Sequence, residues 1–60
     1  MENEKLIELV RKSKHNHEII DKYFNPRREC FGCQPIADFT LKDACAARRI
    51  DLNTVLSQLK

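Results

Sequence analysis

The chain lacks the sequence features on which several common functions depend. It has only one glycine in 60 residues, which excludes a glycine-rich loop that cradles phosphate groups. A membrane-spanning helix needs a run of about 18 apolar residues, and no run in this chain comes close to that length. No serine stands with a histidine and an acid in a familiar catalytic pattern, and no motif places two carboxylates together. We therefore expect no membrane binding, and neither a classical hydrolase nor a classical transferase.

The charge pattern does not indicate nucleic-acid binding. Eleven lysines and arginines stand against nine aspartates and glutamates, so the formal net charge is only +2. The nearest approach to a basic cluster is the pair Arg27 and Arg28, with Arg48 and Arg49 further along the chain. Proteins that bind nucleic acids usually carry a longer basic stripe. We therefore expect no nucleic-acid partner.

Length and composition predict one small globular domain over residues 1–60. A chain this short cannot divide its apolar side chains between two stable cores. The hydrophobic fraction of 42% and the charged fraction of 33% are those of a folded domain. At this size a core rarely contributes more than roughly 3 to 5 kcal/mol, so a metal, a disulfide or a partner subunit often adds stability.

The cysteines predict a cytoplasmic protein. There are three of them, an odd number that does not suit the disulfide framework of a secreted domain. The first four residues, Met1 to Glu4, are acidic and do not resemble a signal peptide. In a reducing cytosol such cysteines are better interpreted as catalytic, redox or metal-binding thiols.

Apolar periodicity predicts an all-α fold, a compact orthogonal bundle of four to five short helices, and no strand pattern of useful length occurs. The first helix is expected from Glu4 to Lys14. A hydrophilic break then follows, with Asn16 as the N-cap of a second helix from His17 to Phe24. Pro26 ends that helix, because proline pushes the preceding residue out of the α region.

Two further helices are predicted by their N-caps. Thr40 with Asp43 resembles a capping box and opens a helix that runs to about Arg49. Asp51 caps a last helix, Leu52 to Leu59, whose apolar residues repeat at helical spacing.

The segment between these helix pairs carries the main chemical feature, Cys30 and Cys33 in a Cys-Phe-Gly-Cys turn. At this spacing both sulfurs can meet across one turn, as reversible disulfide chemistry requires and as two ligands of one metal require. Gly32 is expected to let the turn close, while Phe31 either packs inside or contacts a partner. The spacing alone does not choose between the two chemistries.

Pro35 suits the first turn of a short helix that begins near Cys33. This places Cys33 at a helix N-terminus, where free backbone N–H groups would stabilise its thiolate. Arg27 and Arg28 would add positive charge near the turn, whereas Glu29 would raise the pKa of the neighbouring thiol.

The other metal-ligating side chains are weaker candidates. Cys45 shares a helix face with Leu41 and is expected in the core, with a secondary role as a third metal ligand. His15 and His17 fall in the hydrophilic break, outside any standard zinc-finger spacing, and are expected to be solvated. An iron–sulfur cluster commonly needs four thiolates, so it would require a non-cysteine ligand or a homodimer that pools two Cys-x-x-Cys pairs.

The run from Cys30 to Cys33, then Thr40-Leu41-Lys42-Asp43-Ala44-Cys45, then Ile50-Asp51 and Val55-Leu56 with Leu59, resembles the hybrid-cluster-protein-associated redox disulfide domain. This half of the chain is also similar to the N-terminal domain of the di-iron proteins that repair iron–sulfur clusters, although there the paired cysteines are adjacent. The resemblance implies a helical fold and a link to redox or iron–sulfur biology through Cys30 and Cys33. Relatives usually end the preceding helix with a glycine where this chain has Arg48 and Arg49.

Three hypotheses about function follow. The leading one is a thiol redox module in which Cys30 and Cys33 cycle between dithiol and disulfide with another protein as partner, without a cofactor. The second is a module that binds zinc or an iron–sulfur cluster, shared across a homodimer. The third is a protein interaction module in which the cysteines are incidental.

Overall fold

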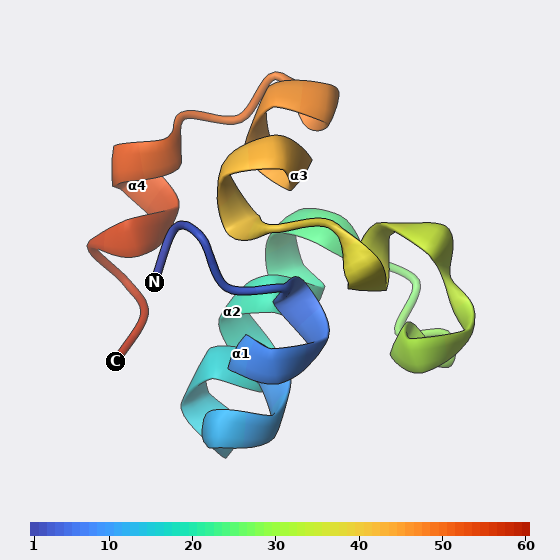
Figure 1. Ribbon diagram of the computed structural model, residues 1–60. Helices are drawn as coiled ribbons and strands as arrows, with labels where there is room; N and C mark the ends of the chain where they lie inside the picture. Colours follow the sequence, from blue (N-terminus) through green and yellow to red (C-terminus); the bar gives the residue numbers. More distant parts are fainter.

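Four short α-helices and two single-turn 3-10 segments form the protein, as seen in a computed structural model that describes residues 1–60. In chain order they are α1 (Leu6–Lys12), α2 (Lys14–Phe24), η1 (Phe31–Cys33), η2 (Pro35–Asp38), α3 (Leu41–Arg48) and α4 (Leu52–Leu56) (Figure 1). The all-α prediction is confirmed. None of the helices has the length and apolar character needed to cross a membrane.

All of these elements contribute to one hydrophobic core, and η1 and η2 are attached to it through Phe31, Ile36 and Ala37. The twelve buried hydrophobic residues are Leu6, Leu9, Ile20, Phe24, Phe31, Ile36, Ala37, Leu41, Ala44, Cys45, Val55 and Leu59. Burial of this apolar surface is the main force that holds short helices together, since helices of this length are marginal alone. The segment that carries the cysteines is therefore anchored to the core through both η1 and η2.

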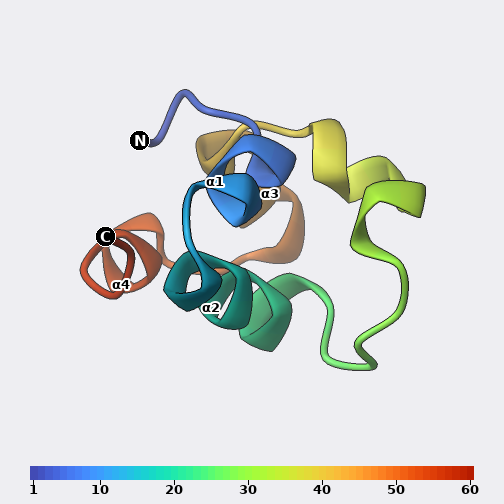
Figure 2. The same ribbon diagram turned by 90° about the horizontal axis from the view of Figure 1, so that it is seen from below.

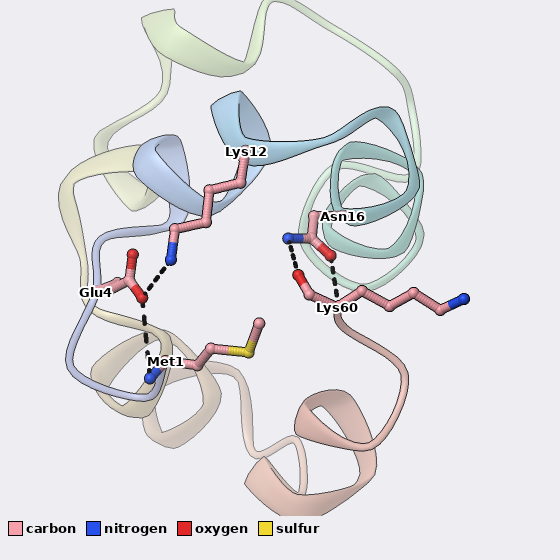
Figure 3. Close-up of polar contacts among 5 residues, drawn as sticks. All are labelled: Met1, Glu4, Lys12, Asn16 and Lys60. Atoms are coloured by element: carbon pink, nitrogen blue, oxygen red, sulfur yellow. Dashed lines mark hydrogen bonds and ion pairs between the residues drawn. The ribbon is translucent and has the colours of Figure 1, made fainter.

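The segment before α1 lies alongside the segment before α3. The backbone N–H of Leu6 donates to the carbonyl of Phe39 at 2.9 Å, and that of Leu41 donates to Glu4 at 2.9 Å. Figure 2 shows the two chain segments side by side above α1. The Glu4 carboxylate also accepts a 2.7 Å bond from Lys12, which lowers the pKa of Glu4 (Figure 3). These contacts fix the backbone at Phe39.

The predicted break between the first two helices is wrong in its extent. Only Ser13 separates α1 from α2, with an extended backbone, and its hydroxyl oxygen accepts the N–H of Asn16 at 3.1 Å. Ser13 is therefore the N-cap, and α1 ends at Lys12, earlier than expected.

Asn16 lies inside α2 and is fully buried. Its amide donates to the carbonyl of Lys60 at 2.9 Å and accepts the Lys60 N–H at 2.8 Å (Figure 3). The sequence pattern predicted Asn16 to be an N-cap, but its hydrogen-bond partner is the backbone of Lys60 at the other end of the chain.

The predicted N-caps of α3 and α4 are confirmed. Thr40 Oγ1 accepts the N–H of Asp43, and Asp51 Oδ2 accepts the N–H of Thr54, each at 3.1 Å. Arg49 ends α3 in the left-handed conformation with φ of 56°, so the turn is made without glycine as expected. Helix α4 ends at Leu56 rather than Leu59.

Candidate functional site

The two cysteines lie in the segment that loops out from α2 to one side of the bundle, drawn in light green to yellow-green (Figures 1 and 2). Cys30 precedes η1 and Cys33 is its last residue. Both are exposed free cysteines, and the thiol of Cys33 donates to Cys30 Sγ across 2.6 Å. A disulfide bond is about 2.05 Å long, so a small side-chain movement would join the two sulfurs.

Cys33 does not lie at a helix N-terminus, contrary to the expectation from Pro35. The second short helix starts at Pro35 with Gln34 as its N-cap, and Gln34 has an extended backbone. The reason is steric, since proline excludes the α region for the residue before it. The 3-10 turn is therefore interrupted at Gln34, and it is Cys30 that precedes the turn.

The short turn makes the two thiols unequal. The pKa of Cys30 is lowered, first by the hydrogen bond from the Cys33 thiol and then by backbone N–H groups of Cys33 and Gly32. The pKa of Cys33 is raised by the same bond and by the negative charge that Cys30 would carry. Backbone N–H groups thus lower the pKa of Cys30 and not, as expected, that of Cys33. The causes of the Cys30 shift include neither Arg27 and Arg28, which were expected to lower it, nor Glu29, which was expected to raise it. Cys30 is therefore the thiol that ionises first.

Phe31 has one of its two expected roles in the turn, whereas Gly32 does not have the role expected of it. Phe31 is buried in the core, so of its two predicted roles the structure shows packing. Gly32 has a negative φ, and a Cβ built on it would meet only Ile7 Cδ1, at an ordinary 3.9 Å. The turn therefore closes without glycine's conformational freedom, and its position depends on Phe31.

Asn25 holds the segment on both sides of the cysteines, a role that sequence reasoning missed. Its Nδ2 donates to the carbonyl of Glu29 at 2.8 Å, and its Oδ1 accepts the Glu29 N–H at 3.2 Å. The same Oδ1 accepts a 2.8 Å bond from Gln34 Nε2. Glu29 precedes Cys30 and Gln34 follows Cys33, so one buried amide holds the backbone before the thiol turn and the Gln34 side chain after it.

Asn25 is in turn supported by α2. Its Nδ2 also donates to Asp21 Oδ1 at 3.2 Å, and the other Asp21 oxygen lies 3.3 Å from His17 Nε2. The signal in the sequence was the Asn-Pro pair at the helix end, which favours a turn in which the asparagine bonds its own backbone neighbours.

The remaining candidate ligands do not join the cysteines. Cys45 is buried in α3, where burial and then the nearby Asp51 raise its pKa. His15 Nε2 lies 2.6 Å from the carbonyl of Gln58, and His17 pairs with Asp21. No group of three or more histidine, cysteine or acidic side chains is placed to hold a metal ion. One chain therefore offers two thiols to a metal and no third ligand.

We compared the chain with models of protein families, with curated protein sequences and with solved structures, and found no match. The resemblance to the redox disulfide domain family thus rests on the Cys30 to Leu59 motifs alone and remains a prediction.

Proposed function

We propose that the protein is a small dithiol–disulfide module that exchanges two electrons with a disulfide of a partner protein. The observation that carries the proposal is the pair of exposed sulfurs of Cys30 and Cys33, 2.6 Å apart and unequal in pKa. Thiol–disulfide exchange needs an accessible thiolate that attacks and a second thiol close enough to resolve the mixed disulfide. Exposure does not distinguish the two cysteines, but their hydrogen bonding does.

In the proposed reaction the Cys30 thiolate attacks one sulfur of the partner disulfide. A mixed disulfide forms, and the partner's other sulfur leaves as a thiolate that takes up a proton. Cys33 then loses its proton and attacks Cys30 Sγ, which releases the second partner sulfur as a thiol. Two electrons and two protons have passed from the module to the partner disulfide, and the module is left with a Cys30–Cys33 disulfide.

The setting of this reaction belongs to the same proposal. Three cysteines, an odd number, do not suit a secreted disulfide framework, which supports a cytoplasmic location. The resemblance supports a partner from redox or iron–sulfur metabolism, because the Cys-Phe-Gly-Cys run is the motif on which it rests.

A metal or cluster module is the second candidate, favoured by the exposure of both sulfurs. One chain brings together two thiolates, so a four-ligand site would need non-cysteine ligands or a second copy that meets this one at its thiol turn. Anaerobically purified protein that is a monomer, colourless and free of stoichiometric zinc or iron would overturn this candidate.

The redox proposal is tested by trapping the mixed disulfide. With a disulfide-bonded peptide as the oxidant, Cys33→Ser should accumulate a stable adduct on Cys30, because no thiol remains to resolve it. Cys30→Ser should form little adduct, and Cys45→Ala should behave as the unaltered protein because Cys45 is buried. Equal labelling of Cys30 and Cys33 would contradict the assigned order. No labelling of either would leave the cysteines incidental and favour a plain interaction module.

A further inference from the structure

A pocket of about 460 Å³ lies next to the thiol turn. Its lining residues are Glu29, Gln34, Pro35, Ile36, Phe39, Ala47 and Arg48. Glu29 directly precedes Cys30 in the chain and Gln34 directly follows Cys33, so two of the lining residues flank the thiol pair. Its volume falls within the about 300–1,000 Å³ of typical ligand sites, which is room for a few side chains of a partner.

The apolar part of the pocket includes an aromatic ring that the fold keeps at the surface. Phe39 is 40% exposed, and only Met1 is a comparably exposed large hydrophobic residue. The Phe39 N–H donates to Ile36 at 3.0 Å, and its carbonyl accepts the N–H of Leu6 at 2.9 Å. These two bonds fix the backbone from which the exposed Phe39 ring projects.

Opposite charges without partners border this apolar surface. Glu29 and Arg48 are both exposed, and neither belongs to an ion pair. The ion pairs of the chain join Glu4 to Lys12 and to the N-terminus, and His17 Nε2 lies 3.3 Å from Asp21. Glu29 adjoins the attacking Cys30, whereas Arg48 stands at the end of α3. The pocket is therefore complementary to a segment that carries both signs of charge around an apolar side chain.

We propose that this pocket docks an extended segment of the partner protein, the one that presents the disulfide to Cys30. An apolar side chain of the segment packs on Phe39, a basic residue beside its cysteine faces Glu29, and an acidic residue further along faces Arg48. The inference rests on the proposed function and adds the class of substrate. That class is a protein disulfide with a basic residue beside its cysteine, followed by an apolar residue and then an acidic one.

Two peptides of identical composition test the docking site, each supplied as its disulfide-bonded dimer. One has arginine before its cysteine, leucine two residues after it and glutamate two residues after the leucine, and the other has arginine and glutamate exchanged. The rate at which each oxidises Cys30 and Cys33 is followed by quenching and mass spectrometry. It is divided by the rate with 2-hydroxyethyl disulfide, a small neutral oxidant.

The first peptide should react about tenfold faster than the exchanged one, as expected when two exposed charge contacts become repulsive. Arg48→Glu should remove this preference, because each peptide then makes one attractive and one repulsive contact. Phe39→Ser should slow both peptides about tenfold by removing the apolar contact. Arg11→Glu makes the same change in net charge on the exposed face of α1, outside the pocket, and should keep the preference.

Each outcome separates the two proposals. If 2-hydroxyethyl disulfide oxidises the pair but the peptides react equally, the docking site is overturned and the redox function stands. If no disulfide oxidises Cys30 and Cys33, the redox function fails, and the docking site fails with it. If Phe39→Ser loses its helical circular dichroism, the docking site is tested with Arg48→Glu alone, because this variant alters only an exposed side chain.

Discussion

Asn25 Oδ1 accepts a hydrogen bond from Gln34 Nε2 at 2.8 Å, across nine positions of the sequence. This bond closes the segment that carries both cysteines, and the same side chain holds the backbone of Glu29. Together with the buried Phe31 ring, this side chain ties the thiol turn to the bundle between α2 and η2. We regard Asn25 as the residue that positions Cys30 and Cys33 relative to each other.

Replacement of Asn25 by alanine should destabilise the fold and loosen the thiol turn. Asn25 is 3% exposed, and its loss removes the partner of Asp21 Oδ1, of the Glu29 backbone and of Gln34 Nε2. We expect the free energy of unfolding to fall by about 1–3 kcal/mol. Urea denaturation measures the loss, and hydrogen exchange should show it concentrated at residues 26–34.

Asn53→Ala is the matched control, because Asn53 is exposed on α4 and makes no side-chain hydrogen bond. This variant should match or slightly exceed the unaltered protein in stability, since alanine favours helices. Equal effects of the two substitutions would show that Asn25 has no special role.

Alkylation should distinguish the two exposed cysteines by pH. Only the thiolate reacts, so a lowered pKa keeps Cys30 reactive as the pH falls below the value at which an ordinary thiol is protonated. Cys30 should therefore react faster than Cys33 at pH 7. As the pH is raised, the labelling rate of Cys30 should level off at a lower pH than the rate of Cys33 does. Rates of iodoacetamide labelling, mapped by peptide mass spectrometry from pH 5 to 10, measure this.

The same experiment on Cys33→Ala tests the cause of the shift. The largest contribution to the lowered Cys30 pKa is the hydrogen bond from the Cys33 thiol. Its removal should move the Cys30 profile to higher pH, toward that of an ordinary cysteine. An unchanged profile would mean that the bond does not set the ionisation of Cys30.

Gly32→Ala should be tolerated in both fold and thiol chemistry. The backbone at this position suits any residue, and the added methyl carbon would lie 3.9 Å from Ile7 Cδ1. We expect the free energy of unfolding to stay the same or rise by up to about 1 kcal/mol, because alanine restricts the unfolded chain. A loss above that size in thermal or urea unfolding would contradict the geometry of the turn.

Arg28→Gly should stabilise the protein, since Arg28 adopts a left-handed conformation with φ of 54°. Relief of this strain, at about 1–2 kcal/mol, exceeds the added entropy of glycine in the unfolded chain. The neighbouring Arg27 lacks a positive φ, so Arg27→Gly carries only the entropic penalty and should destabilise. Urea denaturation of the pair gives the comparison, and the opposite order would refute the assignment.

The parts of the fold predicted correctly are those that short stretches of sequence determine. Thr40 and Asp51 cap their helices through bonds to residues three positions on, so the pattern alone identifies them. Asn16 was misplaced because its partner, Lys60, lies 44 positions away and no local pattern records it. Helix caps can be predicted because they depend on neighbours in the sequence, whereas the hydrogen-bond partner of a buried amide depends on the tertiary structure around it.

The candidate site divides in the same way. The spacing of Cys30 and Cys33 predicted that their sulfurs can meet, and the structure brings them together. Which thiol has the lower pKa was not predictable, because it depends on the hydrogen bonds that Cys30 receives from the Cys33 thiol and from the backbone N–H groups of Cys33 and Gly32. The Asn-Pro pair indicated a turn at Asn25, but the bond to Gln34 could not be predicted, because nine positions separate the two residues.

The most direct test of the account is a redox titration of the intact protein in thiol–disulfide buffers of stepped potential, with acid quenching, alkylation and mass spectrometry. We predict one transition with the loss of two hydrogen atoms, mapped to Cys30 and Cys33, at a potential within the about −270 to −120 mV range of known dithiol proteins. Cys45 should stay a thiol throughout. A pair that remains unlinked across that whole range would contradict the proposed function.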